Sequence, residues 1–82
     1  GVKRAKGLEV RVSTQALNAE LVRQMETIFS EFNGGTPLYL NLRDDRENIN
    51  VDLLSRKFRV KPVNDLVKKM KKLPMVDVRV VY

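Results

Sequence analysis

Alternating apolar and polar residues mark five short segments of this chain as β-strands. In the first, Leu8, Val10 and Val12 alternate with Glu9 and Arg11. Because successive side chains of a strand point to opposite faces, this period of two predicts a strand with one buried face. The other segments with this pattern are residues 37–43, 49–53, 58–60 and 76–82.

Two further segments have apolar residues at the helical spacing of three and four positions. The first runs to Phe32 and follows Asn18, whose side chain is placed to accept a hydrogen bond from the free amides of the first turn. The Asn-Gly-Gly sequence at 33–35 is predicted to end this helix through a left-handed glycine. The second helix is predicted to have Asn64 as its cap and to end before Pro74.

The predicted element order is therefore β-α-β-β-β-α-β, with turns at residues 44–48 and 54–57. Each strand has one apolar side, so we expect a sheet that is covered on one face by both helices. The predicted fold class is α+β, a two-layer sandwich built on a mixed sheet. We expect the last strand, with its valines and Tyr82 on the buried face, to lie inside or beside the hairpin.

The length of 82 residues suits one small domain with a single core. Residues 8–82 are predicted to form that domain, and residues 1–7 a basic leader or the cut end of a longer polypeptide. The chain has no His and no Cys, which removes the commonest general base and Cys-based zinc sites, so we predict no cofactor. No apolar run approaches the roughly 20 residues needed to span a bilayer, and we expect a cytoplasmic protein without a membrane partner.

Charge is unevenly distributed along the chain. Residues 1–53 contain seven Lys or Arg and eight Asp or Glu, whereas residues 54–82 contain nine and two. A basic half on a small domain indicates an acidic partner, either nucleic acid or the acidic face of another protein. The second helix is either a solvated face whose cations offset the helix dipole or a basic ridge extended by Arg56, Lys57, Arg59 and Lys61. Its four lysines are Lys68, Lys69, Lys71 and Lys72.

Two other clusters favour structural explanations. Asp44, Asp45 and Glu47 could supply oxygen ligands to a divalent metal, but they match no calcium-loop spacing and fit a solvated hairpin turn. The outward face of the sheet carries one aromatic residue, Tyr39, among mixed charges, whereas base stacking on a sheet needs aromatics on adjacent strands. We therefore predict no metal site and no base-stacking sheet.

The pattern as a whole is similar to that of a known family, and three segments carry the similarity: residues 6–10 (KGLEV), 35–40 (GTPLYL) and 58–66 (FRVKPVNDL). In their order and spacing the chain resembles the C-terminal domain of the bacterial DNA polymerase III alpha subunit, the replicative polymerase. The third segment matches best, with its aromatic, basic residue, valine, proline, helix cap, acid and leucine. The chain departs at Asn64, where the family often has serine, and in its dense lysines and tight turn at 73–75.

The resemblance implies that this chain is not itself an enzyme, because the catalytic carboxylates of that DNA-directed DNA polymerase, a nucleotidyltransferase, lie elsewhere in the parent polypeptide. In the family this region follows an oligonucleotide-binding barrel and helps to dock the polymerase to the tau subunit of the clamp loader. We expect the isolated domain to be monomeric. From exposure and charge, the residues predicted to contact the partner are Arg56, Lys57, Lys68, Lys69, Lys71, Lys72, Arg79 and Tyr82.

Two functions remain open on this evidence. Docking to tau predicts binding that depends on apolar anchors and survives moderate salt. A nucleic-acid-binding domain, which steers DNA through the basic helix, predicts an affinity that collapses as salt rises. A small acid–base or metal enzyme would need a convergent pocket of perturbed ionisable groups. The sequence argues against one, because it has no His or Cys and its carboxylates are confined to one turn and to scattered surface positions.

Overall fold

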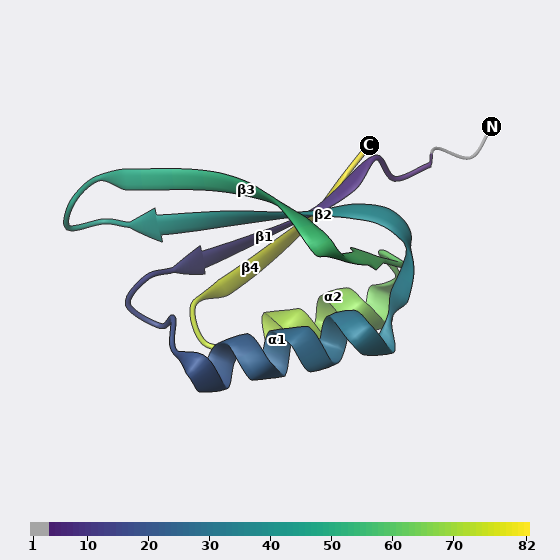
Figure 1. The fold of residues 1–82 in the computed structure, drawn as a ribbon, viewed down its shortest axis with the longest axis horizontal. Helices are drawn as coiled ribbons and strands as arrows, with labels where there is room; N and C mark the ends of the chain where they lie inside the picture. The colour runs from purple at the N-terminus through teal and green to yellow at the C-terminus, as the bar shows by residue number, and fades with distance from the viewer. Residues whose placement is uncertain (1–3) are drawn as a thin grey trace.

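The structure, a computed structural model, describes residues 4–82 and shows one mixed sheet with two helices on one face (Figure 1). The strand order across the sheet is β3-β2-β1-β4. These features confirm the predicted α+β two-layer sandwich. The elements are β1 (Gly7–Ser13), α1 (Ala19–Glu31), β2 (Asn33–Asp44), β3 (Ile49–Val60), α2 (Asn64–Lys71) and β4 (Val76–Val81).

The central strand β1 supplies the middle of the core. It pairs with β2 in parallel and with β4 antiparallel, so both of its edges are hydrogen-bonded. The inward side chains of Leu8, Val10 and Val12 are at most 1% exposed. The alternation in residues 8–12 therefore predicted both the strand and its buried face.

The first helix, α1, begins as predicted. The Oδ1 atom of Asn18 accepts a hydrogen bond from the Leu21 N–H at 2.8 Å, which satisfies one of the free amides of the first turn. Leu21, Met25 and Phe29 are the buried residues of the helix. After Phe32 the chain passes directly into β2, and the Phe32 carbonyl accepts a hydrogen bond from the Lys61 N–H at 2.7 Å.

The role predicted for the glycines after α1 is wrong. No glycine in the described part of the chain has a positive φ, and Gly34 and Gly35 lie in the first residues of β2. A Cβ atom on Gly34 would lie 2.8 Å from the Lys61 nitrogen and 2.8 Å from the Val60 carbonyl carbon. Gly34 is thus required by the close approach of two backbones, and not by a left-handed turn.

The turn predicted at residues 54–57 is a bulge inside one continuous strand, β3. Tyr39 pairs with Leu54 and Pro37 with Arg59, so β3 advances five positions while β2 advances two. The extra residues form an irregular segment that Ser55 stabilises, since its Oγ atom accepts from the Phe58 N–H at 3.1 Å. The third and fourth predicted strands are therefore the two halves of β3 on either side of the bulge.

The second helix, α2, starts one residue earlier than predicted. Its N-cap is Val63, which makes no side-chain cap hydrogen bond, and Asn64 is already the first helical residue. The turn before it is closed by the backbone, because the Val63 N–H donates to the Lys61 carbonyl at 2.8 Å. The prediction that Asn64 caps α2 is wrong, whereas Leu66 and Met70 are fully buried as their spacing predicts.

The last strand, β4, lies next to β1 and not inside or beside the hairpin of β2 and β3. Insertion of β4 between β2 and β3 would break their hydrogen-bonded ladder, which starts at the loop with Asp44 opposite Ile49. The edge of β1 that does not pair with β2 is available, and β4 pairs there. Tyr82 is 62% exposed and not on a buried face. Val81 pairs with Gly7, the first residue of β1, so Tyr82 lies beyond the last paired residue.

A leader was predicted at residues 1–7, of which residues 1–3 lie outside the described part of the chain. Its last residue, Gly7, is the first residue of β1. The Lys6 N–H donates to the Val81 carbonyl at 2.7 Å and extends the pairing with β4 by one residue. Within residues 4–82, no helix has the length and apolarity to cross a membrane.

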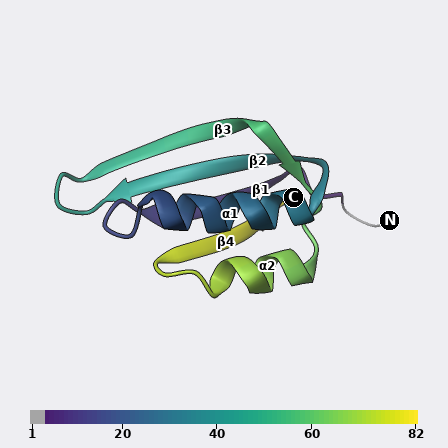
Figure 2. The same ribbon diagram turned by 60° about the horizontal axis from the view of Figure 1, so that its bottom comes forward.

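The β2–β3 hairpin projects past the helices and makes the molecule long in one direction, with extents of 43 × 23 × 22 Å (Figure 1). The helices lie below the rest of the sheet, and α1 lies between α2 and β3 when the molecule is turned (Figure 2). The sheet therefore has one open face along its whole width, which we call the outer face, and an uncovered inner face along the hairpin.

Candidate partner-binding surface

The four lysines of α2 and its C-cap are all exposed, and they divide into one that forms an ion pair and three that form none within residues 4–82. Lys69 Nζ donates to Glu31 Oε1 at 2.6 Å and lies 5.4 Å from the centre of the Phe32 ring, so it ties α2 to the end of α1. No salt bridge within residues 4–82 involves the three others, Lys68, Lys71 and Lys72. They leave the surface of α2 positively charged, on the side opposite its buried Leu66 and Met70.

A second predicted pair, Arg56 and Lys57, lies in the bulge of β3. Lys57 Nζ donates to Glu26 Oε2 at 3.0 Å and lies 5.2 Å from the centre of the Phe58 ring. Lys57 thus ties the bulge to α1 much as Lys69 ties α2 to it. Arg56 is exposed and takes part in no salt bridge among the described residues.

The last two predicted residues lie on β4 and after it. Arg79 is on the outer face, opposite Glu9 of β1, and its Nη2 atom lies 3.4 Å from Glu9 Oε2. The same carboxylate group accepts from Arg11 Nε at 2.8 Å, so Glu9 is shared by two arginines. Tyr82 is exposed at the end of the chain, next to Lys6.

The structure does not bring the eight predicted residues together. The strand β3, which carries Arg56 and Lys57, and the helix α2, which carries the lysines, lie on opposite sides of α1 (Figure 2). The part of the expected ridge that Arg56 and Lys57 would form is therefore separated from the lysines of α2 by α1. The role of each of the eight residues in partner binding stays a prediction.

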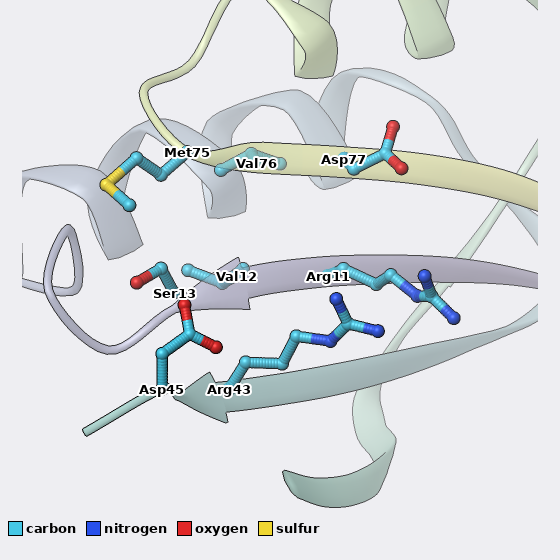
Figure 3. A pocket seen from close by; sticks show the side chains of 8 residues that line it. All are labelled: Arg11, Val12, Ser13, Arg43, Asp45, Met75, Val76 and Asp77. Carbon is cyan, nitrogen blue, oxygen red and sulfur yellow. The ribbon is translucent and has the colours of Figure 1, made fainter. Parts of the chain in front are cut away.

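A shallow cavity of about 350 Å³ lies on the outer face where β1 and β2 end. Figure 3 shows the guanidinium groups of Arg11 and Arg43 pointing the same way along the sheet, with Asp77 on β4 across from Arg11. Asp45 of the hairpin loop lies beside Ser13 at the mouth. The two carboxylates offset the charge of the two guanidinium groups, so the cavity has little positive potential to attract an anion. It is therefore a weak candidate for phosphate binding.

The acidic hairpin loop has a structural role. Asp44 Oδ1 accepts hydrogen bonds from the N–H groups of Arg46 at 3.0 Å and Glu47 at 3.3 Å, as in an Asx turn. Asn48, at φ 53°, completes the turn. Among residues 4–82, no group of three or more acidic residues is arranged to hold a metal ion.

The outer face also carries a buried polar contact that sequence reasoning missed. Asn41 is 6% exposed, and its Nδ2 atom donates to the side-chain oxygens of Asn50 and Asp52, at 2.7 Å in the case of Asp52. Both acceptors lie on β3, so the amide joins the two strands of the hairpin. Alternation placed Asn41 on the outer face, but only the strand pairing shows that its neighbours cover it.

A second cavity on the outer face, of about 300 Å³, lies beside the bulge of β3. Sequence reasoning missed it because residues 54–57 were predicted to form a turn. The available signal was the pair Leu53 and Leu54, since two adjacent apolar residues in a strand face opposite sides. We call this cavity the bulge pocket, and its lining residues are Pro37, Tyr39, Leu54, Ser55, Arg56 and Arg59.

Comparison with known proteins gives one result for the chain as a whole. The family model for the C-terminal domain of the DNA polymerase III alpha subunit matches residues 8–81. The match spans every helix and strand apart from Gly7, the first residue of β1. A search among curated proteins finds no match.

Proposed function

The chain belongs to the family formed by the C-terminal domain of the DNA polymerase III alpha subunit, and from this we propose that it is a non-catalytic module that docks the polymerase to the tau subunit of the clamp loader. The observation that carries the proposal is the family match over residues 8–81. Within the parent polymerase, such a module would attach the enzyme to the replisome and leave nucleotide transfer to another part of the polypeptide.

The chemistry of the side chains supports a non-catalytic role. The sequence contains neither His nor Cys, the usual neutral-pH base and thiol nucleophile. Several carboxylates have structural partners: Glu9 binds Arg11 and Arg79, and Asp44 binds amides of its own loop. Among residues 4–82, the exposed side chains without an ion pair include cations such as Arg56 and Lys71 and large aliphatic residues such as Leu54, and these suit contact with another macromolecule.

The direct test is a calorimetric titration of this chain with the tau subunit from the same source, at low salt and at about 0.15 M salt. Docking through packed anchors predicts saturable binding at both concentrations, with an affinity that changes little. The absence of heat at both concentrations would overturn the docking role of this domain.

The second candidate, steering of DNA, is favoured by one specific observation, the three unpaired lysines on α2. In this case the triple charge reversal K68E/K71E/K72E abolishes binding of a fluorescent duplex measured by anisotropy. In a plot of the logarithm of the wild-type affinity against the logarithm of the salt concentration, the slope is then about −0.9 for each phosphate contacted. A salt-independent affinity, or an unchanged affinity in the triple variant, would exclude α2 as a DNA-binding surface.

A further inference from the structure

We infer that the bulge pocket is a docking site for a partner protein segment that presents a large apolar side chain flanked by carboxylates. The inference rests on the proposed docking function, for which it names a contact surface and the chemistry of the partner. The pocket volume of about 300 Å³ is at the small end of ligand sites, which span about 300–1,000 Å³. It suits one or two side chains.

Tyr39 forms one wall of the pocket. Its ring lies against Gly7 of the neighbouring strand β1, where a Cβ atom would be 2.7 Å from Cε2 and 3.0 Å from Cδ2 of the ring. Only glycine lets the ring lie down on the sheet in this way. Tyr39 is nevertheless 40% exposed, so its ring offers an aromatic surface to a partner while it rests on Gly7.

The opposite wall is fixed by the bulge itself. Ser55 closes the bulge through its hydrogen bond with the Phe58 N–H, and the Phe58 ring packs in a tilted arrangement against Phe29 of α1, with ring centres 5.7 Å apart. Phe58 thereby anchors the irregular segment to the core from the inner face. The pocket is consequently a built feature of the strand register, and not a gap between mobile side chains.

The pocket combines an exposed apolar surface with unpaired positive charge. Leu54 is 57% exposed and pairs with Tyr39 across the two strands. A large aliphatic side chain and an aromatic side chain are therefore both open to solvent at this place. Arg56 and Arg59 line the pocket and take part in no salt bridge within residues 4–82. Arginine and tyrosine are also among the residues most enriched in the energetic centres of protein interfaces.

The charge of the surroundings specifies the partner further. The nearest acidic residues of the outer face are already engaged, Glu9 with two arginines and Asp52 with Asn41. Neither neutralises Arg56 or Arg59, so a ligand with carboxylates beside its apolar anchor matches the pocket in charge as well as polarity.

A peptide fits this surface better than a nucleic acid strand. Tyr39 is the one aromatic residue that lines the pocket, whereas base stacking on a sheet uses aromatic residues on adjacent strands. A peptide can place its carboxylates over the arginines alone and its apolar side chain on Leu54. Aliphatic surface adds affinity for such a side chain, whereas a phosphodiester backbone gains nothing from it.

The test measures binding of a fluorescein-labelled hexapeptide, Leu-Phe flanked by two acidic residues on each side, by fluorescence polarisation at physiological salt. The double variant R56E/R59E should weaken binding at least about tenfold, and Leu54→Ala about threefold. The matched control R43E/R46E makes the same charge change near the tip of the hairpin and should alter the affinity less than about twofold. A peptide with lysines in place of the acidic residues should not bind.

Three results would overturn the inference. Absence of peptide binding to the wild-type chain would remove the site. Equal losses in R56E/R59E and R43E/R46E would show non-specific attraction to a basic protein. Displacement of the peptide by a thymidine oligonucleotide, with a higher affinity that also depends on Arg56 and Arg59, would make the pocket a nucleic-acid site.

The same variants separate this inference from the proposed function. If tau binds the wild-type chain and R56E/R59E with the same affinity, docking stands and the bulge pocket is not its contact surface. If the acidic peptide binds the pocket but tau does not bind the chain, the pocket stands and docking to tau fails.

Discussion

Strands β1 and β3 carry the same alternation of apolar and polar residues, yet their apolar side chains end in opposite environments. Val10 of β1 is fully buried, whereas Val51 of β3 is 40% exposed, although both face the helix side of the sheet. The difference lies in the layer below, because the helices cover β1 and stop short of the projecting hairpin (Figure 1). Alternation specifies which face a side chain takes, and a second element decides whether that face is buried.

The uncovered inner face of the hairpin has a further consequence for stability. Leu40 and Leu42 of β2 pack against the core only in part, and an apolar cavity of about 330 Å³ lies between them and α1. The hairpin is held mainly by its own ladder and by Asn41 on the outer face. We therefore expect the covered half to account for most of the free energy of unfolding, and the hairpin to open locally at lower cost.

Matched valine-to-alanine substitutions test this comparison with the largest expected effect. Val10→Ala removes two methyl groups from a fully buried site and should lower the free energy of unfolding by about 2–3 kcal/mol. Val51→Ala removes the same atoms from a half-exposed site and should cost less than about 1 kcal/mol. Urea denaturation followed by circular dichroism measures both.

Equal losses in the two variants would contradict the comparison. They would mean that the inner face of the hairpin is buried in solution, for instance against a second copy of the chain. Sedimentation of wild-type protein at the same concentration would then distinguish a dimer from the expected monomer.

Two adjacent glycines sharpen the comparison at the point where the covered half joins the hairpin. Gly34→Ala places a Cβ atom against the backbone of Val60 and Lys61, and the strain should cost about 1–3 kcal/mol. Gly35→Ala is the control, because no atom lies within 4 Å of its Cβ position. It should change stability by less than about 0.5 kcal/mol. Equal effects would mean that the two backbones move apart at Gly34 without cost.

Local patterns in the sequence predicted most of the fold. The buried faces of β1, α1 and α2 followed from periods of two and of three to four, because these elements pack in the covered half. The bulge in β3 did not follow, since nothing between Leu54 and Lys57 shows that pairing with β2 resumes at Arg59. The place of β4 also depends on which strand edge is free, and this is a property of the assembled sheet.

The candidate surfaces were less predictable than the fold. Charge identified the lysines of α2, but no local pattern shows that Lys69 is tied to Glu31 across two helices. The bulge pocket needs Leu54 opposite Tyr39 and Gly7 under the Tyr39 ring, three residues that strand pairing brings together from distant parts of the chain. Tertiary pairing, and not local pattern, creates both features.

The two helix starts within the covered half provide the test with the smallest expected effect. Asn18 and Asn64 are the same residue type near an N-terminus, but only Asn18 makes a cap hydrogen bond. Asn18→Ala should therefore lower the free energy of unfolding by about 1 kcal/mol, since the Leu21 N–H loses its partner. Asn64→Ala should change it by less than about 0.5 kcal/mol, because backbone bonds already close that turn.

Urea denaturation of both variants, each against wild type, measures this difference. A loss of about 1 kcal/mol in Asn64→Ala would mean that its side chain does cap α2 in solution, as the sequence pattern predicted, and that the helix begins one residue later. Amide hydrogen exchange then locates the effect. If only the first turn of α1 exchanges faster in Asn18→Ala, the cap acts locally. If β1 also exchanges faster, α1 and the sheet it covers unfold as one unit, and the hairpin is the separate one.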